Sequence, residues 1–164
     1  MRDSLAIYPG SFDPITNGHV DIIERGLRIF DQIIVAVLEN PKKEALFTTQ
    51  ERVAMIQEIF AAEPRVKVNS FDGLLVDFAR KHQARIVMRG LRAISDFEFE
   101  FQMALMNRKL NPELETLFMM PNLNYTFLSS RLVKEIYMLG GCIKGLVPET
   151  VEKRLREKFA PPRT

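Results

Sequence analysis

The residues LAIYPGSFDPITNGHVDIIERGLRIFDQIIVAVL, from position 5 to position 38, set the architecture of the chain. Residues 5–8 are a short apolar run that ends at Pro9-Gly10, which is typical of a buried strand followed by a turn. Residues 33–38 are continuous and rich in β-branched side chains, as in a strand that is covered on both faces. Between them, from Gly18 onward, apolar residues recur every three or four positions and predict a helix with one apolar face: Val20, Ile23, Leu27 and Phe30.

The remainder of the chain repeats this alternation. Further strands are expected at residues 66–68, 86–88 and 117–120, and further helices at 74–82, after Ser95, from Ser129 to Gly140-Gly141, and at 148–159. Another helix begins at Thr48, where Thr48 and Glu51 fit a capping box. The alternation predicts an α/β fold: a single Rossmann-like domain, with a parallel five-stranded sheet and helices on both faces. We expect this domain to span residues 1–159 and residues 160–164 to form a loose tail.

Composition excludes several classes of protein. The chain has 164 residues, of which 46% are hydrophobic and 27% charged, which indicates one globular domain and argues against disorder. No apolar run approaches the roughly 18 residues that span a bilayer. Cys142 is the only cysteine, so an internal disulfide or a cysteine-built zinc site is excluded. The 23 basic and 21 acidic residues leave a net charge of +2, so we expect no nucleic-acid partner, no membrane partner and a cytoplasmic location.

In parallel sheets, ligands bind at the carboxyl ends of the strands, near the point where the strand order reverses. The end of the first expected strand carries the sequence Tyr8-Pro9-Gly10-Ser11-Phe12-Asp13-Pro14-Ile15-Thr16-Asn17-Gly18-His19. Its glycine spacing fits neither a dinucleotide-binding loop nor a Walker loop, but glycines before a helix N-terminus suit an anion such as phosphate. His19 falls in the first helical turn, where it either faces the anion or merely caps and packs the helix.

Basic side chains follow two further strands. Arg89 and Arg92 flank Gly90-Leu91, and their forked donors match phosphate. The alternative for these arginines is salt bridging to nearby carboxylates, namely Asp96, Glu98 or Glu100. Lys42 and Lys43 follow residues 33–38, and either lysine can contact phosphates or remain solvated in the loop.

The motif Thr16-Asn17-Gly18-His19 resembles the T/H-x-G-H signature of the nucleotidyltransferase superfamily. A larger ordered set of motifs, spread over nearly the whole chain, is similar to the bacterial phosphopantetheine adenylyltransferase family. Besides residues 8–19, this set comprises Arg89-Gly90-Leu91-Arg92, Asp96-Phe97-Glu98, Met106-Asn107-Arg108, Pro112-Glu113-Leu114-Glu115 and Ser129-Ser130-Arg131-Leu132-Val133-Lys134-Glu135. The four-residue signature alone is weak, whereas the ordered set is specific.

The resemblance implies a reaction. The adenylyl group of ATP passes to 4′-phosphopantetheine, which gives dephospho-coenzyme A and pyrophosphate, the penultimate step of coenzyme A synthesis. The attack is direct and in line, without a covalent enzyme intermediate. The resemblance also implies Mg²⁺ bound with the ATP phosphates rather than in a protein metal site, and it suggests a hexamer.

The same resemblance assigns roles to residues. The catalytic residues that it implies are His19, Lys43 and Arg92. The ATP-binding residues that it implies are Ser11, Phe12, His19, Gly90, Leu91, Arg92, Glu100, Tyr125, Thr126, Phe127, Leu128, Ser129, Ser130 and Arg131. The phosphopantetheine-binding residues that it implies are Ser11, Lys43, Leu75, Arg89 and Glu135. Two alternatives stay open: Lys42 in place of Lys43, and Leu75 as a plain core leucine.

The segment 95–109 allows two interpretations. Alternation at residues 96–101 is typical of a half-buried strand, but the length of the segment and its Met, Leu, Glu and Gln content favour a helix. On a helix its apolar residues form two stripes on opposite sides: Phe97, Phe101, Ala104 and Leu105 on one, and Phe99, Met103 and Met106 on the other. We expect the sheet to cover the first stripe and a neighbouring subunit the second, which predicts a homo-oligomer. Cover from a loop or from the C-terminal helix is the alternative.

Two other functions compete with the adenylyltransferase interpretation. One is another enzyme of the superfamily, such as a cytidylyltransferase or a nicotinamide-mononucleotide transferase. The other is a nucleotide-sensing module that has lost catalysis.

Overall fold

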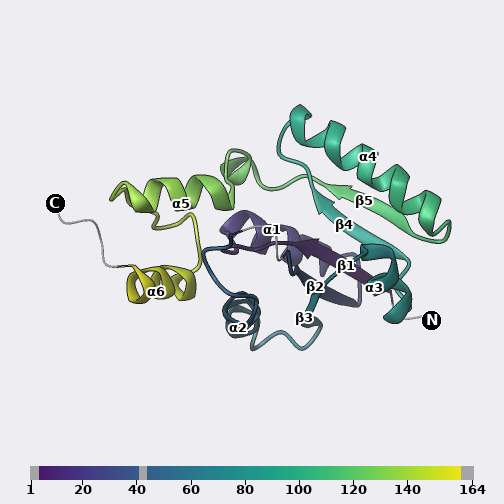
Figure 1. Ribbon diagram of the computed structural model, residues 1–164, viewed down its shortest axis with the longest axis horizontal. Helices are drawn as coiled ribbons and strands as arrows, with labels where there is room; N and C mark the ends of the chain where they lie inside the picture. The colour runs from purple at the N-terminus through teal and green to yellow at the C-terminus, as the bar shows by residue number, and fades with distance from the viewer. Residues whose placement is uncertain (1–3, 41–43, 160–164) are drawn as a thin grey trace.

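The computed structural model describes residues 4–40 and 44–159 (Figure 1). The strands are β1 (Leu5–Gly10), β2 (Gln32–Leu38), β3 (Val66–Phe71), β4 (Ile86–Gly90) and β5 (Glu115–Met119). The helices are α1 (Asn17–Gly26), α2 (Thr49–Ile59), α3 (Leu75–Lys81), α4 (Ile94–Leu110), α5 (Ser130–Met138) and α6 (Glu149–Lys158), and a short 3-10 helix, η1, covers Leu123–Tyr125. The expected tail at residues 160–164 lies outside the described residues. None of the described helices is long and apolar enough to cross a membrane.

The five strands form one sheet in the order β3-β2-β1-β4-β5. Every pair of neighbouring strands is parallel, and the central strand β1 places Ala6 beside Ile33 of β2 and Ile86 of β4. The predicted parallel five-stranded sheet is therefore confirmed. Because the chain runs from β1 to β3 on one side and then crosses to β4 on the other, the strand order reverses between β1 and β4.

Helices cover both faces of the sheet, as predicted. One buried cluster joins the β1 and β2 side chains of one face to apolar residues of α1, α2, α5 and α6. A second cluster joins the opposite face to α3. The alternation along a strand explains this division, because Ala6 and Tyr8 belong to the first cluster and Ile7 to the second.

Some element boundaries differ from the predictions. The helix α1 ends at Gly26 and Leu27 is its C-cap, although the apolar period continues to Phe30. Phe30 is still buried, but it follows a turn and is not part of the helix. The strand β3 extends to Phe71, beyond the predicted end at residue 68. Pro148 is the N-cap of α6 rather than a residue of its first turn. The capping box of Thr48 and Glu51 is confirmed.

The segment 95–109 is helical, which confirms one of its two interpretations. The expectation that the sheet covers its first apolar stripe is wrong: Phe97, Phe101 and Leu105 are each between 43% and 49% exposed. The second stripe is open too, with Phe99 62% exposed. The reason is the position of α4 beside β5, an edge strand of the sheet (Figure 1). The ring of Phe97 lies 6.1 Å from that of Phe118 in β5, measured between centroids, and stacks on Phe101 of its own helix.

Candidate active site

A cavity of about 260 Å³ opens at the carboxyl ends of β1 and β4, at the point where the strand order reverses. Three segments supply its walls: the end of β1 with the turn into α1, the end of β4 with the start of α4, and the residues before α5. The residues that line it are Tyr8, Pro9, Gly10, Ser11, Phe12, Thr16, Gly18, His19, Ile22, Arg89, Gly90, Arg92, Asp96, Glu100, Pro121, Tyr125, Leu128, Ser129 and Ser130.

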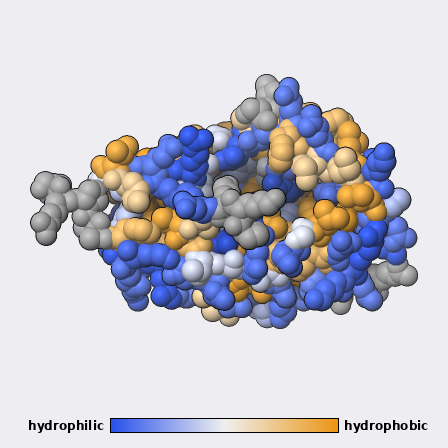
Figure 2. Space-filling view, in the orientation of Figure 1, coloured by the Kyte–Doolittle hydropathy of each residue, from blue (hydrophilic) through white to orange (hydrophobic). Residues whose placement is uncertain are grey.

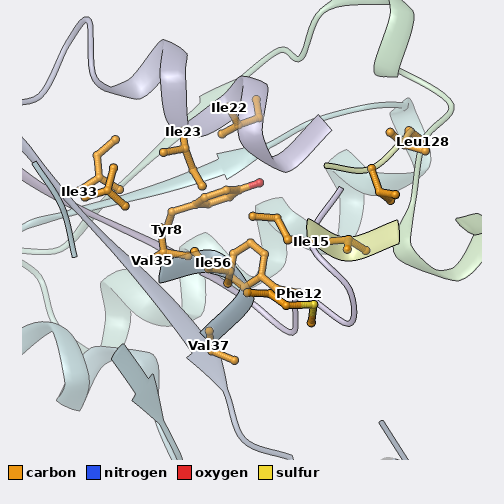
Figure 3. Packing of buried hydrophobic residues seen from close by; sticks show 14 of the residues in the cluster. Tyr8, Phe12, Ile15, Ile22, Ile23, Ile33, Val35, Val37, Ile56 and Leu128 are labelled. Carbon is orange, nitrogen blue, oxygen red and sulfur yellow. The ribbon is translucent and has the colours of Figure 1, made fainter. Parts of the chain in front are cut away.

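Tyr8 of β1 and Phe12 of the turn that follows lie side by side (Figure 3), and both line the cavity. Phe12 adopts a positive φ of 47° and is buried, which turns its ring back toward the sheet. That ring packs edge-on against Tyr8 at 5.4 Å and against His19 at 5.1 Å. A side chain at position 10 would press on this ring, because a Cβ there would lie 3.0 Å from Cζ of Phe12. The aromatic floor thus supports His19 from below.

His19 is the third residue of α1 and completes a capping box with Thr16. The backbone N–H of Thr16 donates to Nδ1 of His19 at 3.0 Å, so the neutral ring carries its proton on Nε2. Burial, followed by the charges of Arg92 and Arg89, lowers the pKa of His19 to about 3. The side chain therefore caps the helix and also lines the cavity, as a neutral N–H donor.

Arg89 is fixed by two partners. Its Nε donates to Oε2 of Glu100 at 2.7 Å, its Nη2 donates to the other carboxylate oxygen, and its Nη1 donates to the Pro9 carbonyl at 2.5 Å. Burial by itself lowers the pKa of Arg89, but the Glu100 carboxylate outweighs it and holds that pKa above its usual value. The salt-bridge alternative for Arg89 is thus present in the structure, and it fixes the guanidinium at the cavity wall.

Arg92 joins two walls of the cavity. Its Nε donates to Asp96 at 3.0 Å, at the start of α4. Its Nη1 donates to the carbonyl of Leu128 at 2.8 Å. The guanidinium therefore holds the residues before α5 beside the end of β4.

The segment before α5 contributes backbone amides and hydroxyls. Ser129 is the N-cap of α5, as predicted, and accepts from the N–H of Leu132 at 3.1 Å. Ser130 donates its hydroxyl to the Pro14 carbonyl at 2.7 Å, which ties α5 to the turn after β1. The N-termini of α1 and α5 thus lie beside the same cavity, and their partial positive charge favours an anion there.

The structure brings together most of the residues predicted from the sequence, and it leaves others outside the cavity. Leu91 donates its N–H to Met119, and Thr126 donates its hydroxyl to the Leu123 carbonyl. Arg131 and Glu135 pair with each other at 3.0 Å on the surface. Phe127 is 60% exposed, and Leu75, the first residue of α3, packs against the second buried cluster. Lys42 and Lys43 lie outside the described residues.

Two buried polar residues were missed by the sequence interpretation. Asp13 accepts the N–H groups of Leu46 and Phe47, both at 2.9 Å, and the Lys134 ammonium at 3.0 Å. Arg52 donates to three carbonyls: Ser11 at 2.6 Å, Phe47 at 3.1 Å and Leu38 at 3.2 Å. For Arg52 the sequence held a signal, since it precedes Ile56 by four residues and shares its inward helix face.

The carboxylates of the cavity suit arginines better than a metal ion. No group of three or more His, Cys, Asp or Glu side chains within residues 4–40 and 44–159 could hold a metal. Asp96 and Glu100, the two acids that line the cavity, each bind a guanidinium. The site is thus a pocket of N–H donors edged by two helix N-termini.

A parallel sheet with a cavity at its switch point, edged by two helix N-termini, is typical of α/β proteins that bind phosphate groups. Residues 7–136 match the family model described as cytidylyltransferase-like, and the chain belongs to that family. Over 162 residues it is 58% identical to a protein named phosphopantetheine adenylyltransferase from Geobacter sulfurreducens, with 99% of each chain covered. Over 154 residues it is 57% identical to a protein of the same name from Dictyoglomus turgidum, with 94% of this chain and 96% of that protein covered. These similarities confirm the family resemblance of the sequence motifs.

Proposed function

We propose that this protein transfers the adenylyl group of ATP to 4′-phosphopantetheine and releases pyrophosphate. The observation that carries the proposal is the meeting of His19, Arg89 and Arg92 in one cavity at the switch point of the sheet. The chain is also similar over nearly its whole length to proteins named phosphopantetheine adenylyltransferase.

The reaction that we propose needs no nucleophile from the protein. A phosphate oxygen of phosphopantetheine forms a bond to the α-phosphorus of ATP, and the bond from that phosphorus to the bridging oxygen breaks as pyrophosphate leaves. Catalysis then rests on in-line positioning of two polyanions and on donors that stabilise the charge in the transition state. His19 is suited to this role because its ring is neutral near pH 7, with its single proton on Nε2, and this N–H can donate a hydrogen bond without a change in protonation.

The two arginines bind different substrates in this proposal. Arg89 takes the phosphopantetheine side, and Arg92 takes ATP together with the residues before α5. Of the five N–H groups of Arg89, Glu100 and Pro9 occupy three, so two remain for a phosphate. The acids therefore fix the direction of each guanidinium without using all of its donors.

We propose that Mg²⁺ enters with the phosphates of ATP, where it neutralises part of their charge. Among the described residues, the acids of the cavity are held by arginines and offer the ion no ligand set of their own. We also propose that the protein acts in the cytoplasm.

Self-association is part of the proposal. In both stripes of α4 apolar side chains are more than 40% exposed, among them Phe97, Phe99 and Met103. Figure 2 shows apolar residues at the surface over the part of the molecule where Figure 1 places α4. Soluble monomers rarely leave so continuous an apolar face in water. We propose that a second copy covers it, in the hexamer that the resemblance suggests.

A pyrophosphate-release assay tests the activity. Purified protein with ATP, Mg²⁺ and phosphopantetheine should release pyrophosphate, whereas CTP in place of ATP, or nicotinamide mononucleotide as the acceptor, should not. Faster release with either replacement would favour another enzyme of the superfamily. Binding of ATP without any release of pyrophosphate would favour a nucleotide-sensing module.

A further inference from the structure

Tyr8 lies at the floor of the cavity and has no part in the function proposed above. It is the fourth residue of β1 and is only 5% exposed. Its ring is wedged beside Phe12 at 5.4 Å and beside His19 at 6.4 Å, and Figure 3 shows the ring under α1 with its hydroxyl oxygen at the far tip. The apolar part of the side chain is thus explained by packing, but the hydroxyl is not.

The hydroxyl of Tyr8 makes no hydrogen bond to any described residue. Across residues 4–40 and 44–159, no side-chain oxygen or nitrogen that is sealed from solvent lacks a partner. The Tyr8 oxygen must therefore be open to the cavity that its side chain lines. Gly90 borders the part of the cavity beside this oxygen. A Cβ at position 90 would lie 3.9 Å from the oxygen, in van der Waals contact, so the lack of a side chain there keeps the space beside the hydroxyl open. A buried tyrosine whose hydroxyl meets only an open cavity is unusual, because buried tyrosines ordinarily place the hydroxyl on a partner.

The charges around this hydroxyl favour an anion. Arg89 and Arg92 are both close enough to lower the pKa of Tyr8, and Glu100 opposes them. Burial outweighs these charges and raises the pKa of Tyr8 above its ordinary value, so the group stays protonated and can donate. A phosphate oxygen placed between the two guanidinium groups and His19 could therefore also accept a hydrogen bond from the Tyr8 hydroxyl.

We propose that Tyr8 is a phosphate-binding residue, whose hydroxyl donates a hydrogen bond to a phosphate oxygen of a substrate held between His19, Arg89 and Arg92. The identity of that substrate rests on the proposed function, whereas the phosphate contact rests on the cavity itself. The competing explanation is that Tyr8 only fills space and that its hydroxyl binds water.

The test compares Tyr8→Phe with a matched control, Tyr137→Phe. Both variants lose one hydroxyl and keep the ring. The Tyr137 hydroxyl donates to the Phe159 carbonyl at 3.1 Å, away from the cavity. Tyr137→Phe should therefore lower the urea midpoint and leave ligand binding unchanged. Tyr8→Phe should leave the midpoint unchanged, because no bond within the protein is lost.

Calorimetric titration with ATP, 4′-phosphopantetheine and adenosine measures the contact. In Tyr8→Phe the affinity for ATP or for phosphopantetheine should fall roughly 10- to 150-fold, as expected for a hydrogen bond to a charged group, while the affinity for adenosine stays that of the wild type. The value of kcat/KM should fall by a similar factor. Wild-type affinity for both phosphate ligands would overturn the proposal, and so would an equal loss for adenosine. If the wild type binds ATP but releases no pyrophosphate, the proposed function fails, and the affinities of Tyr8→Phe still decide the role of Tyr8.

Discussion

Asp13 is the residue whose removal should destabilise the site most clearly. Asp13 is only 6% exposed, and its carboxylate accepts hydrogen bonds from the N–H groups of Leu46 and Phe47 and from the ammonium of Lys134. Asp13→Ala leaves two amides without a partner, at about 1–3 kcal/mol each when buried, and it strands the partly buried Lys134. We expect the free energy of unfolding to fall by about 3–5 kcal/mol, in the range observed when one partner of a buried ion pair is removed.

That loss is large against the 5–15 kcal/mol by which a domain of this size is usually stable. It also has a functional consequence, because Asp13 fixes the chain at Leu46 and Phe47 to the turn that precedes His19. Residues 42 and 43, which carry the predicted catalytic lysine, stand only a few positions before Leu46 in the sequence. Turnover of the folded variant should therefore fall more than its affinity for ATP.

Urea denaturation and pyrophosphate release, measured on the same preparations, check this prediction. Lys134→Met is the control, since it removes the ammonium and leaves both amides on Asp13. We expect Lys134→Met to lose only about 1 kcal/mol, because the Lys134 side chain is 29% exposed and the Asp13 carboxylate keeps its two N–H donors. A result in which Asp13→Ala is no less stable than Lys134→Met would refute the reasoning, because the two amide contacts would then contribute nothing.

Other variants test the remaining roles. His19→Ala should reduce turnover by several orders of magnitude with a modest change in ATP affinity, and an affinity loss that accounts for the whole defect would contradict this. Because the folded protein holds the pKa of His19 at about 3 and the unfolded chain near 6.5, stability should fall as pH drops below about 6.5, and His19→Asn should flatten that slope in urea titrations. Arg89→Ala should weaken phosphopantetheine binding and Arg92→Ala ATP binding in calorimetry; equal effects on both ligands would disprove the division. In sedimentation, the wild type should run as an oligomer that Phe99→Glu with Met103→Glu disrupts, and an 18.9 kDa monomer would end the idea.

The local pattern of the chain was enough to predict the elements of the fold. These elements depend on interactions between residues within a few positions of one another, so a short stretch of sequence is enough to predict them. Examples are the strand and helix periods, the capping box at Thr48 and the N-cap at Ser129. The parallel sheet followed from the alternation of these elements, since a right-handed crossover leaves few other arrangements. The position of the cavity followed in turn, because parallel strands end at one edge of the sheet.

Tertiary structure alone decided which partners each charged side chain takes. Arg92 reaches Leu128 and Asp13 reaches Leu46, and these contacts join segments that lie 36 and 33 residues apart. Such contacts are directional and short, so they depend on loop paths and strand register that no periodicity encodes. The same holds for α4, whose two apolar stripes are visible in the sequence. Only its packing at the edge of the sheet left both stripes open, because a lone edge strand is too narrow to cover either one.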